Sequence, residues 1–272
     1  MNERSPALDR RLVRRRFSRA ARSYAGASRV EAEVAARMLE RLDYVRLSPR
    51  RILDAGSGPG RDAKKLKRRY PGAHLIALDS AFAVLPRAGW RERLFGTRST
   101  PVCADMQQLP FAPASFELAW SNMALHWLDD PLAALRELER VLAPDGLLMF
   151  STLGPDTLKE LRAAAGAARV HEFADMHDVG DMLVAAGFSA PVMDMEMLHV
   201  AYASGAQLLE DLRASGQTSA RRDRPRGLAG RGFLAEFRAR ALSATYEVVY
   251  GHAWKRPARE DRKTVRVFKR IP

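Results

Sequence analysis

A glycine-rich turn between two apolar segments holds the residues of this chain that are best suited to chemistry. Residues 53–60 read LDAGSGPG, and residues 78–80 read LDS. Glycine lets the backbone turn sharply and approach a ligand, because no Cβ is in the way. In a doubly wound sheet, an acid after the second strand lies where it can bind a ribose hydroxyl. The spacing therefore predicts a site for an adenosine-containing cofactor at the carboxyl ends of the strands.

The residues around this turn discriminate among such cofactors. A phosphate-binding loop needs a lysine after its last glycine, but Gly60 is followed by arginine. Asp54 lies two residues before the first of these glycines, where it would repel a pyrophosphate and suits the cationic methionine part of S-adenosylmethionine. A further acid, Asp105, follows a third predicted strand. Together these positions predict S-adenosylmethionine as the cofactor.

The apolar pattern elsewhere predicts alternating strands and helices. Strands are expected at residues 51–55, 73–78, 100–104, 116–120, 146–152, 191–201 and 245–253. Helices are expected at residues 30–42, 61–70, 80–88, 131–142, 155–165, 175–186 and 207–214, and a loop or lid at 215–232. Such alternation favours an α/β fold with a mostly parallel sheet covered on both faces. Cys103 and the alternating methionines of 193–197 are expected to face its core.

The positive charge of the chain is concentrated at its two ends. The formal net charge is +13 over 272 residues. Residues 1–26 hold eight arginines and two acids, and residues 213–272 hold sixteen basic residues and five acids. Residues 27–212 hold twenty-one basic and twenty-five acidic residues. The positive charge at the two ends of the chain indicates an anionic partner, either nucleic acid or an acidic carrier protein. A purely solubilising role is the alternative.

Cysteine usage and hydropathy indicate the compartment. Cys103 is the single cysteine, so an intrachain disulfide is impossible, which is typical of a reducing compartment. No apolar run approaches the roughly 20 residues of a membrane span. The arginine-rich N-terminus lacks the apolar core of a secretory signal. The sequence therefore predicts a cytoplasmic protein without a membrane partner.

The segment after the fourth predicted strand is the expected place for acceptor recognition. Residues 120–127 read WSNMALHW, and ligands of such sheets bind beyond the carboxyl ends of the strands. His126 could act as a general base or as a hydrogen-bonding wall of the pocket. Trp127 is expected in the pocket wall or in the core.

Six segments spread over nearly the whole chain carry a more specific resemblance. They are residues 16–24 (RFSRAARSY), 105–111 (DMQQLPF), 120–122 (WSN), 150–161 (FSTLGPDTLKEL), 175–181 (DMHDVGD) and 246–254 (YEVVYGHAW). In these segments the chain resembles the malonyl-[acyl-carrier protein] O-methyltransferases of biotin synthesis, a family of class I S-adenosylmethionine-dependent methyltransferases. It departs from the family pattern at Ser57, Pro59 and Ala25, and the stretch 221–231 has no place in that pattern.

The resemblance implies a Rossmann-like fold with a seven-stranded, mostly parallel sheet. It implies an N-terminal helical lid over 1–45 and a methyltransferase domain over 46–272, with a helical insertion and basic loop near 204–242. The implied activity is methylation of the free carboxyl of malonyl-acyl carrier protein, or of malonyl-CoA, which primes pimeloyl synthesis and leaves S-adenosylhomocysteine. The implied protein partner is the acidic acyl carrier, and no metal is expected.

The same resemblance assigns roles to individual residues. The cofactor-binding residues are Tyr24, Asp54, Ala55, Gly56, Ser57, Gly58, Gly60, Asp79, Ser80, Asp105, Met106 and Ser121. The acceptor site is expected at Asn122, His126 and Trp127, and Ser121 and His126 are the candidates for a catalytic part. A carboxyl group with a pKa of about 4.3 is ionised at neutral pH. The enzyme therefore needs to position the carboxylate more than it needs a base to deprotonate it.

Other functions fit parts of the sequence. An arginine-hydroxylating assembly factor of respiratory complex I shares the patterns of residues 154–161 and 178–187, although segment 16–24 argues against it. A nucleic-acid methyltransferase would carry Asn-Pro-Pro-Tyr or Asn-Pro-Pro-Phe after strand four, where this chain has Ser-Asn-Met. A methyltransferase for another small acceptor and a non-enzymatic binding module complete the alternatives.

Overall fold

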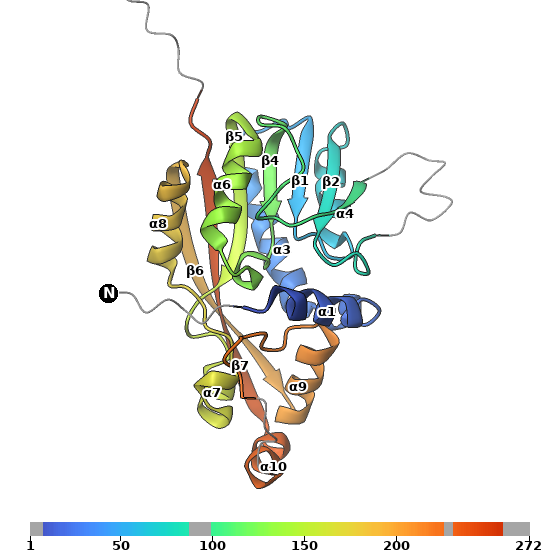
Figure 1. Cartoon of the computed structure of the whole chain (residues 1–272), viewed down its shortest axis with the longest axis vertical. Coiled ribbons are helices and arrows are strands. Elements are labelled where there is room, and N and C mark those ends of the chain that lie inside the picture. Colours follow the sequence, from blue (N-terminus) through green and yellow to red (C-terminus); the bar gives the residue numbers. More distant parts are fainter. Residues whose placement is uncertain (1–7, 87–98, 226–230, 258–272) are drawn as a thin grey trace, which may run out of the picture.

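A single twisted sheet organises the structure, a computed structural model that describes residues 8–86, 99–225 and 231–257 (Figure 1). In this part of the chain the sheet has seven strands in the order β3-β2-β1-β4-β5-β7-β6. The strands are β1 (Arg51–Ala55), β2 (His74–Asp79), β3 (Ser99–Cys103), β4 (Phe116–Ser121), β5 (Leu142–Leu153), β6 (Ser189–Tyr202) and β7 (Leu242–Trp254). The first five are parallel, and β7 runs antiparallel between β5 and β6. The predicted α/β fold is confirmed.

Helices cover both faces of the sheet. They are α1 (Arg10–Ala20), α2 (Tyr24–Ala27), α3 (Arg29–Arg41), α4 (Arg61–Arg69), α6 (Pro131–Val141), α7 (Lys159–Ala165), α8 (Met176–Ala186), α9 (Gly205–Ala214) and α10 (Arg231–Ala239), with short 3-10 turns η1 (Leu42–Tyr44), η2 (Leu125–Trp127) and η3 (Ala167–Arg169). Helices α3 and α4 pack on one face and α6 and α8 on the other. The predicted apolar stripe of α3 is confirmed, because Val34, Met38 and Leu42 are fully buried.

Local capping chemistry explains why several predicted boundaries are right. The Asp130 carboxylate accepts a hydrogen bond from the amide N–H of Ala133, and Pro131 opens α6 at a position where no N–H is needed. Asp175 caps α8 in the same manner, and Gly187 ends that helix in the left-handed conformation. None of the helices in the described residues is long and apolar enough to cross a membrane.

Three expectations about the sheet and its connections are wrong. Residues 81–86 form turns rather than the start of a helix at 80–88, because the Asp79 carboxylate accepts the N–H of Ala81; residues 87–88 lie outside the described part. Cys103 is exposed, since β3 is an edge strand. Met195 and Met197 are also exposed, whereas Met193 packs with the α6 and α8 cluster. The methionines do lie on one face of β6. However, β6 extends beyond the part of this face that α8 covers, so the later methionines are exposed.

The segments around the sheet also differ in part from the prediction. Helix α7 begins at Lys159 rather than near 155, and α10 occupies residues 231–239, where a loop or no element was expected. Helices α9 and α10 lie between β6 and β7 in the sequence, as the expected helical insertion does. Helix α1 lies across the end of the parallel strands, beside the segment that follows α9 (Figure 1). The N–H of Asp9 donates to the Ala220 carbonyl at 2.9 Å, which ties these two distant segments together.

Candidate cofactor and acceptor site

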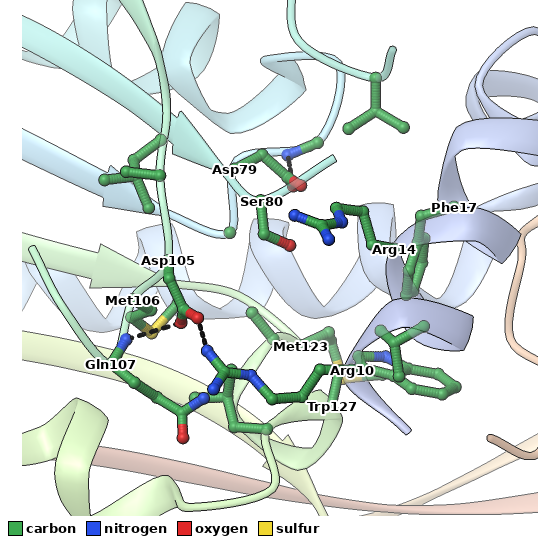
Figure 2. Close-up of a pocket in the computed structure, with 18 of the residues that line it drawn as sticks. Arg10, Arg14, Phe17, Asp79, Ser80, Asp105, Met106, Gln107, Met123 and Trp127 are labelled. Atoms are coloured by element: carbon green, nitrogen blue, oxygen red, sulfur yellow. Dashed lines mark hydrogen bonds and ion pairs between the residues drawn. The ribbon is translucent and has the colours of Figure 1, made fainter. Parts of the chain in front are cut away.

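A cavity of about 330 Å³ lies between α1 and the carboxyl ends of the central parallel strands. Its wall combines the glycine turn, the ends of β2 and β3, the segment after β4 and one face of α1. Figure 2 shows Arg10, Arg14 and Phe17 of α1 facing Asp79, Ser80 and Asp105 across it. This is the edge at which parallel α/β sheets bind ligands.

Most of the predicted site residues line this cavity. Those that do are Tyr24, Gly56, Gly58, Asp79, Ser80, Asp105, Met106, Asn122 and Trp127. Those whose atoms are not part of its wall are Asp54, Ala55, Ser57, Gly60, Ser121 and His126. The second group consists largely of residues beneath the turn or at the end of β4, so a role in binding for them stays a prediction.

The glycine turn requires its glycines. Gly56, Gly58 and Gly60 have φ values of +81°, +53° and +75°, a region that side chains rarely adopt. The N–H groups of Gly56 and Ser57 both donate to the Leu78 carbonyl, at 2.8 and 2.9 Å. A Cβ on Gly56 would lie 2.4 Å from the Cβ of Ala124. The turn therefore brings backbone, not side chain, to the cavity.

Buried acids give this end of the cavity its electrostatic character. Asp54 and Asp62 are 1% and 8% exposed, and burial raises the pKa of each. Burial likewise raises the pKa of Asp79 against the opposing effect of its backbone hydrogen bonds. Within the described residues, Asp54 Oδ2 has no hydrogen-bond partner. Asp79 lies in the cavity wall and Asp54 and Asp62 lie behind it, so a cationic ligand in the cavity would favour the ionised acids. The residues present thus fit the ammonium and sulfonium groups of S-adenosylmethionine.

Asp79 is held in place and still has capacity for a ligand. Its Oδ2 accepts the N–H of Gly58 at 3.1 Å, and its Oδ1 accepts the N–H of Ala81 at 2.8 Å. Each carboxylate oxygen has two acceptor positions, so one on each oxygen is left. Those two positions suit a pair of vicinal hydroxyls such as those of ribose.

A hydrogen-bond network that the sequence analysis missed supports the segment after β4. Asp62 Oδ2 accepts from Trp120 Nε1 at 3.2 Å and from Asn122 Nδ2 at 2.9 Å. Asn122 Oδ1 accepts from the Ser151 hydroxyl at 2.8 Å, and Asn122 Nδ2 also donates to the Glu31 carbonyl. Both amide hydrogens of Asn122 therefore bond to other residues of the protein. Asn122 thus supports the cavity wall.

Helix α1 contributes three arginines to the cavity wall that were not predicted, Arg10, Arg11 and Arg14. Arg10 forms an ion pair with Asp105 and approaches Asp129 at 3.4 Å. Arg14 extends into the cavity toward Ser80 (Figure 2). The spacing of four residues puts Arg10 and Arg14 on one face of a helix, and this signal could have identified them. Through Arg10, α1 is tied to the loop that follows β3.

His126 and Trp127 belong to an aromatic cluster behind the cavity. Trp127 packs edge-on against Phe17 with ring centroids 5.2 Å apart, and against His171 at 5.0 Å. His126 lies 5.6 Å from Phe173, and its Nδ1 is 3.4 Å from the Thr152 hydroxyl. Burial, with His171 nearby, lowers the pKa of His126 well below its usual value. His126 is therefore neutral at physiological pH.

Buried Glu31, which packs beside this site, predicts a pH-dependent stability. Burial raises the pKa of Glu31 to about 7, although its carboxylate accepts a hydrogen bond from Gln217. The native state therefore binds more protons than the unfolded state between about pH 4.5 and 7. The free energy of unfolding should fall as pH rises through this window, by at most about 3 kcal/mol for this group.

The substitution Glu31→Gln should remove that part of the pH dependence. We expect E31Q and the parent protein to be similarly stable at pH 4.5, and E31Q to be the more stable at pH 8. Urea unfolding at both pH values measures the difference. Glu33→Gln, on an exposed side chain of the same helix, is the matched control. A parent protein that loses no more stability than E31Q between the two pH values would refute the assignment.

Comparison with known proteins agrees with the fold and the site. Residues 53–150 match a family of methyltransferase domains. The crystal structure of the YcgJ protein of Bacillus subtilis superposes with a TM-score of 0.60 at 18% identity, covering 84% of this chain and 100% of that one. The fold and the matched domain define a class I methyltransferase, and the residues of the site fit S-adenosylmethionine.

Sequence relatives specify the family. Malonyl-[acyl-carrier protein] O-methyltransferases of Gallionella capsiferriformans and a Methylovorus species are 47% and 49% identical to the chain. These matches cover 96% and 93% of this chain, and 96% and 91% of the two relatives. The chain belongs to the malonyl-[acyl-carrier protein] O-methyltransferase family.

Proposed function

We propose that the protein methylates the free carboxyl of a malonyl thioester borne by an acyl carrier protein, and so primes pimeloyl synthesis for biotin. The near full-length identity of 47% and 49% to two enzymes that bear this name carries the proposal. We place the reaction in the cytoplasm, which the single cysteine supports.

The reaction requires the protein to bind the cofactor and the acceptor and to orient them toward each other. When bound, S-adenosylmethionine supplies a methyl group on a sulfonium, and its transfer to a carboxylate moves no proton. Asp54 would bind the amino group of the methionine part, and Asp79 the ribose hydroxyls. Asp105 and Met106 would flank the adenine, and Tyr24 with α1 would exclude water. Because the acceptor carboxylate is already ionised, neutral His126 is not needed as a base.

Methyl transfer to defined acceptors tests the proposal. Labelled S-adenosylmethionine is incubated with the protein and malonyl-acyl carrier protein, with acetyl-acyl carrier protein as the matched control. We expect label on the malonyl carrier only, as a base-labile ester. Cofactor binding without transfer to any malonyl thioester would direct the search to another acceptor.

A basic surface on α1 is the proposed docking site of the carrier. Arg11 and Arg15 of α1 are exposed, and so is Arg222, whose Nε donates to the Leu8 carbonyl at 3.0 Å. The two strongly basic regions of the sequence thus meet beside the mouth of the cavity. Arg221 is not part of this surface, because it is 5% exposed and forms ion pairs with Glu172 and Asp223 at 2.5 and 2.7 Å.

Charge reversal on this surface should weaken carrier binding selectively. We expect the double variant Arg15→Glu/Arg222→Glu to raise KM for malonyl-acyl carrier protein about tenfold at low salt with kcat nearly unchanged, because electrostatic steering would be lost. KM for a malonyl thioester of a short uncharged thiol should not change. Lys64→Glu/Arg68→Glu, on exposed residues of α4, is the control. Equal KM values for both double variants would exclude this docking surface.

A further inference from the structure

A second, smaller cavity lies behind Trp127. Its volume is about 140 Å³, and Trp127 lines both this cavity and the larger one. Leu153, at the end of β5, forms part of its wall. Residues of α7, η3, α9 and β7 and of the segments 170–173 and 217–219 also line it. The cavity therefore lies beyond the carboxyl edge of the sheet, next to the cofactor site but separate from its acids.

Two residues of the cavity wall each have a buried polar side-chain atom that lacks a partner among the described residues. These atoms are His171 Nδ1 and Ser219 Oγ. His171 Nε2 lies 2.9 Å from the His126 carbonyl oxygen, an acceptor, so Nε2 carries the proton. The ring is neutral, because burial lowers the pKa of His171 to about 4, and its Nδ1 is left as an acceptor. A buried polar group without a partner is destabilising, so two such atoms beside one cavity favour a ligand that pairs with them.

The charged residues of the cavity wall are all basic. They are Arg169 and Arg213, and no acid in the described part of the chain lines this cavity. Arg169 is half-buried and forms no ion pair with any residue in 8–86, 99–225 or 231–257. Nearby Arg221, in contrast, is neutralised by Glu172 and Asp223. The remainder of the wall is mainly apolar, with Leu158, Leu161 and Leu212 among its residues. This combination suits a short acyl unit that ends in an anion.

We propose that the cavity receives the malonyl unit of the acceptor and that Arg169 binds its free carboxylate. The Ser219 hydroxyl donates to the thioester carbonyl, and His171 Nδ1 accepts an amide N–H of the pantetheine arm. Trp127 is the wall between this cavity and the cofactor site, so the acceptor carboxylate reaches the methyl donor when the Trp127 side chain turns aside. Neutral acyl groups lack the anion that Arg169 would pair with, which makes Arg169 a specificity-determining residue. This inference rests on the proposed function.

Substitution of Arg169 tests the inference. Arg169→Gln keeps much of the side-chain length and removes the charge. We expect it to raise KM for malonyl-acyl carrier protein at least tenfold and to leave the dissociation constant of S-adenosylmethionine within twofold. Arg169→Lys should recover part of the lost affinity, because lysine keeps the positive charge but lacks the planar guanidinium that can pair with a carboxylate through two hydrogen bonds. Arg136→Gln, on an exposed residue of α6, is the control and should behave as the parent protein.

A binding measurement separates this inference from the proposed function. Malonyl- and acetyl-acyl carrier proteins are titrated into the protein saturated with S-adenosylhomocysteine. The parent protein should prefer the malonyl carrier about tenfold, and R169Q should bind both equally. A parent protein that methylates the malonyl carrier while R169Q keeps the same KM and the same preference overturns the inference and leaves the proposed function standing. A parent protein that neither methylates nor prefers the malonyl carrier overturns both.

Discussion

The variant Asp54→Asn should bind S-adenosylmethionine about 10- to 100-fold more weakly than the parent protein. Asp54 is 1% exposed, and its Oδ2 lacks a partner among the described residues. A hydrogen bond to a charged group contributes about 1.5–3 kcal/mol, and asparagine would replace an ion pair by a neutral contact. Titration calorimetry with S-adenosylmethionine and with S-adenosylhomocysteine, which both carry the amino group, measures the loss.

Two controls make the result on Asp54 specific. Methylthioadenosine lacks the amino-acid part, so its affinity should be equal in D54N and the parent protein. Burial raises the pKa of Asp54, so the ionised carboxylate is disfavoured in the folded state, and the ligand-free variant should be at least as stable as the parent. Asp145→Asn, at an exposed position near the start of β5, should change nothing. A D54N protein that also loses methylthioadenosine, or unfolds, would show that Asp54 supports the turn instead.

The variant Gly56→Ala should lose cofactor binding and part of its stability. The new Cβ would lie 2.4 Å from the Cβ of Ala124, and Gly56 has a φ of +81°. The left-handed conformation alone costs a side chain about 1–2 kcal/mol. The contact adds to that cost and must displace either the turn or the segment after β4, both of which line the cavity. We expect a melting temperature several degrees lower and cofactor affinity reduced more than 100-fold.

Two further variants separate the backbone effect from the contact. Gly187→Ala should have a similar conformational cost, because Gly187 has a φ of +105°. Its Cβ, however, would lie 3.7 Å from the nearest atoms of Glu139, which is an ordinary van der Waals distance. It should destabilise the protein without changing cofactor affinity. The double variant Gly56→Ala/Ala124→Gly removes the clashing atom and should recover most of the affinity. No recovery in the double variant would mean that strain in the turn, rather than this contact, causes the loss.

The parts of the site that follow from local backbone chemistry could be predicted. Strand β1 has the predicted bounds, and the glycine turn after it has the positive φ values that its glycines suggest. Asp79 ends β2 and Asp105 lies in the loop after β3, so their place at the carboxyl edge follows from the alternation of strands and helices. Caps at Asp130 and Asp175 likewise act within a few residues of themselves.

The parts that depend on contacts between distant segments could not be predicted. Arg10 pairs with Asp105 only because α1 crosses the strand ends, and Asn122 became a structural support only because Asp62 and Ser151 lie beside it. The exposure of Met195 and Met197 depends on how far α8 extends over β6. None of these lengths or crossings has a signal within a short window of sequence.

The sequence alone indicated the class of fold, the cofactor and the family, because the glycine turn, the acids at the end of β2 and after β3, the capped helices and the family segments are local features of the chain. Tertiary structure decided the acceptor side. It brought Trp127 of the segment after β4, Arg169 and His171 of the segment after β5, and Ser219 of the segment after α9 around one cavity. These residues are separated by up to about 90 positions, so only the packing of the long β6 and β7 strands and their helices against α1 could join them.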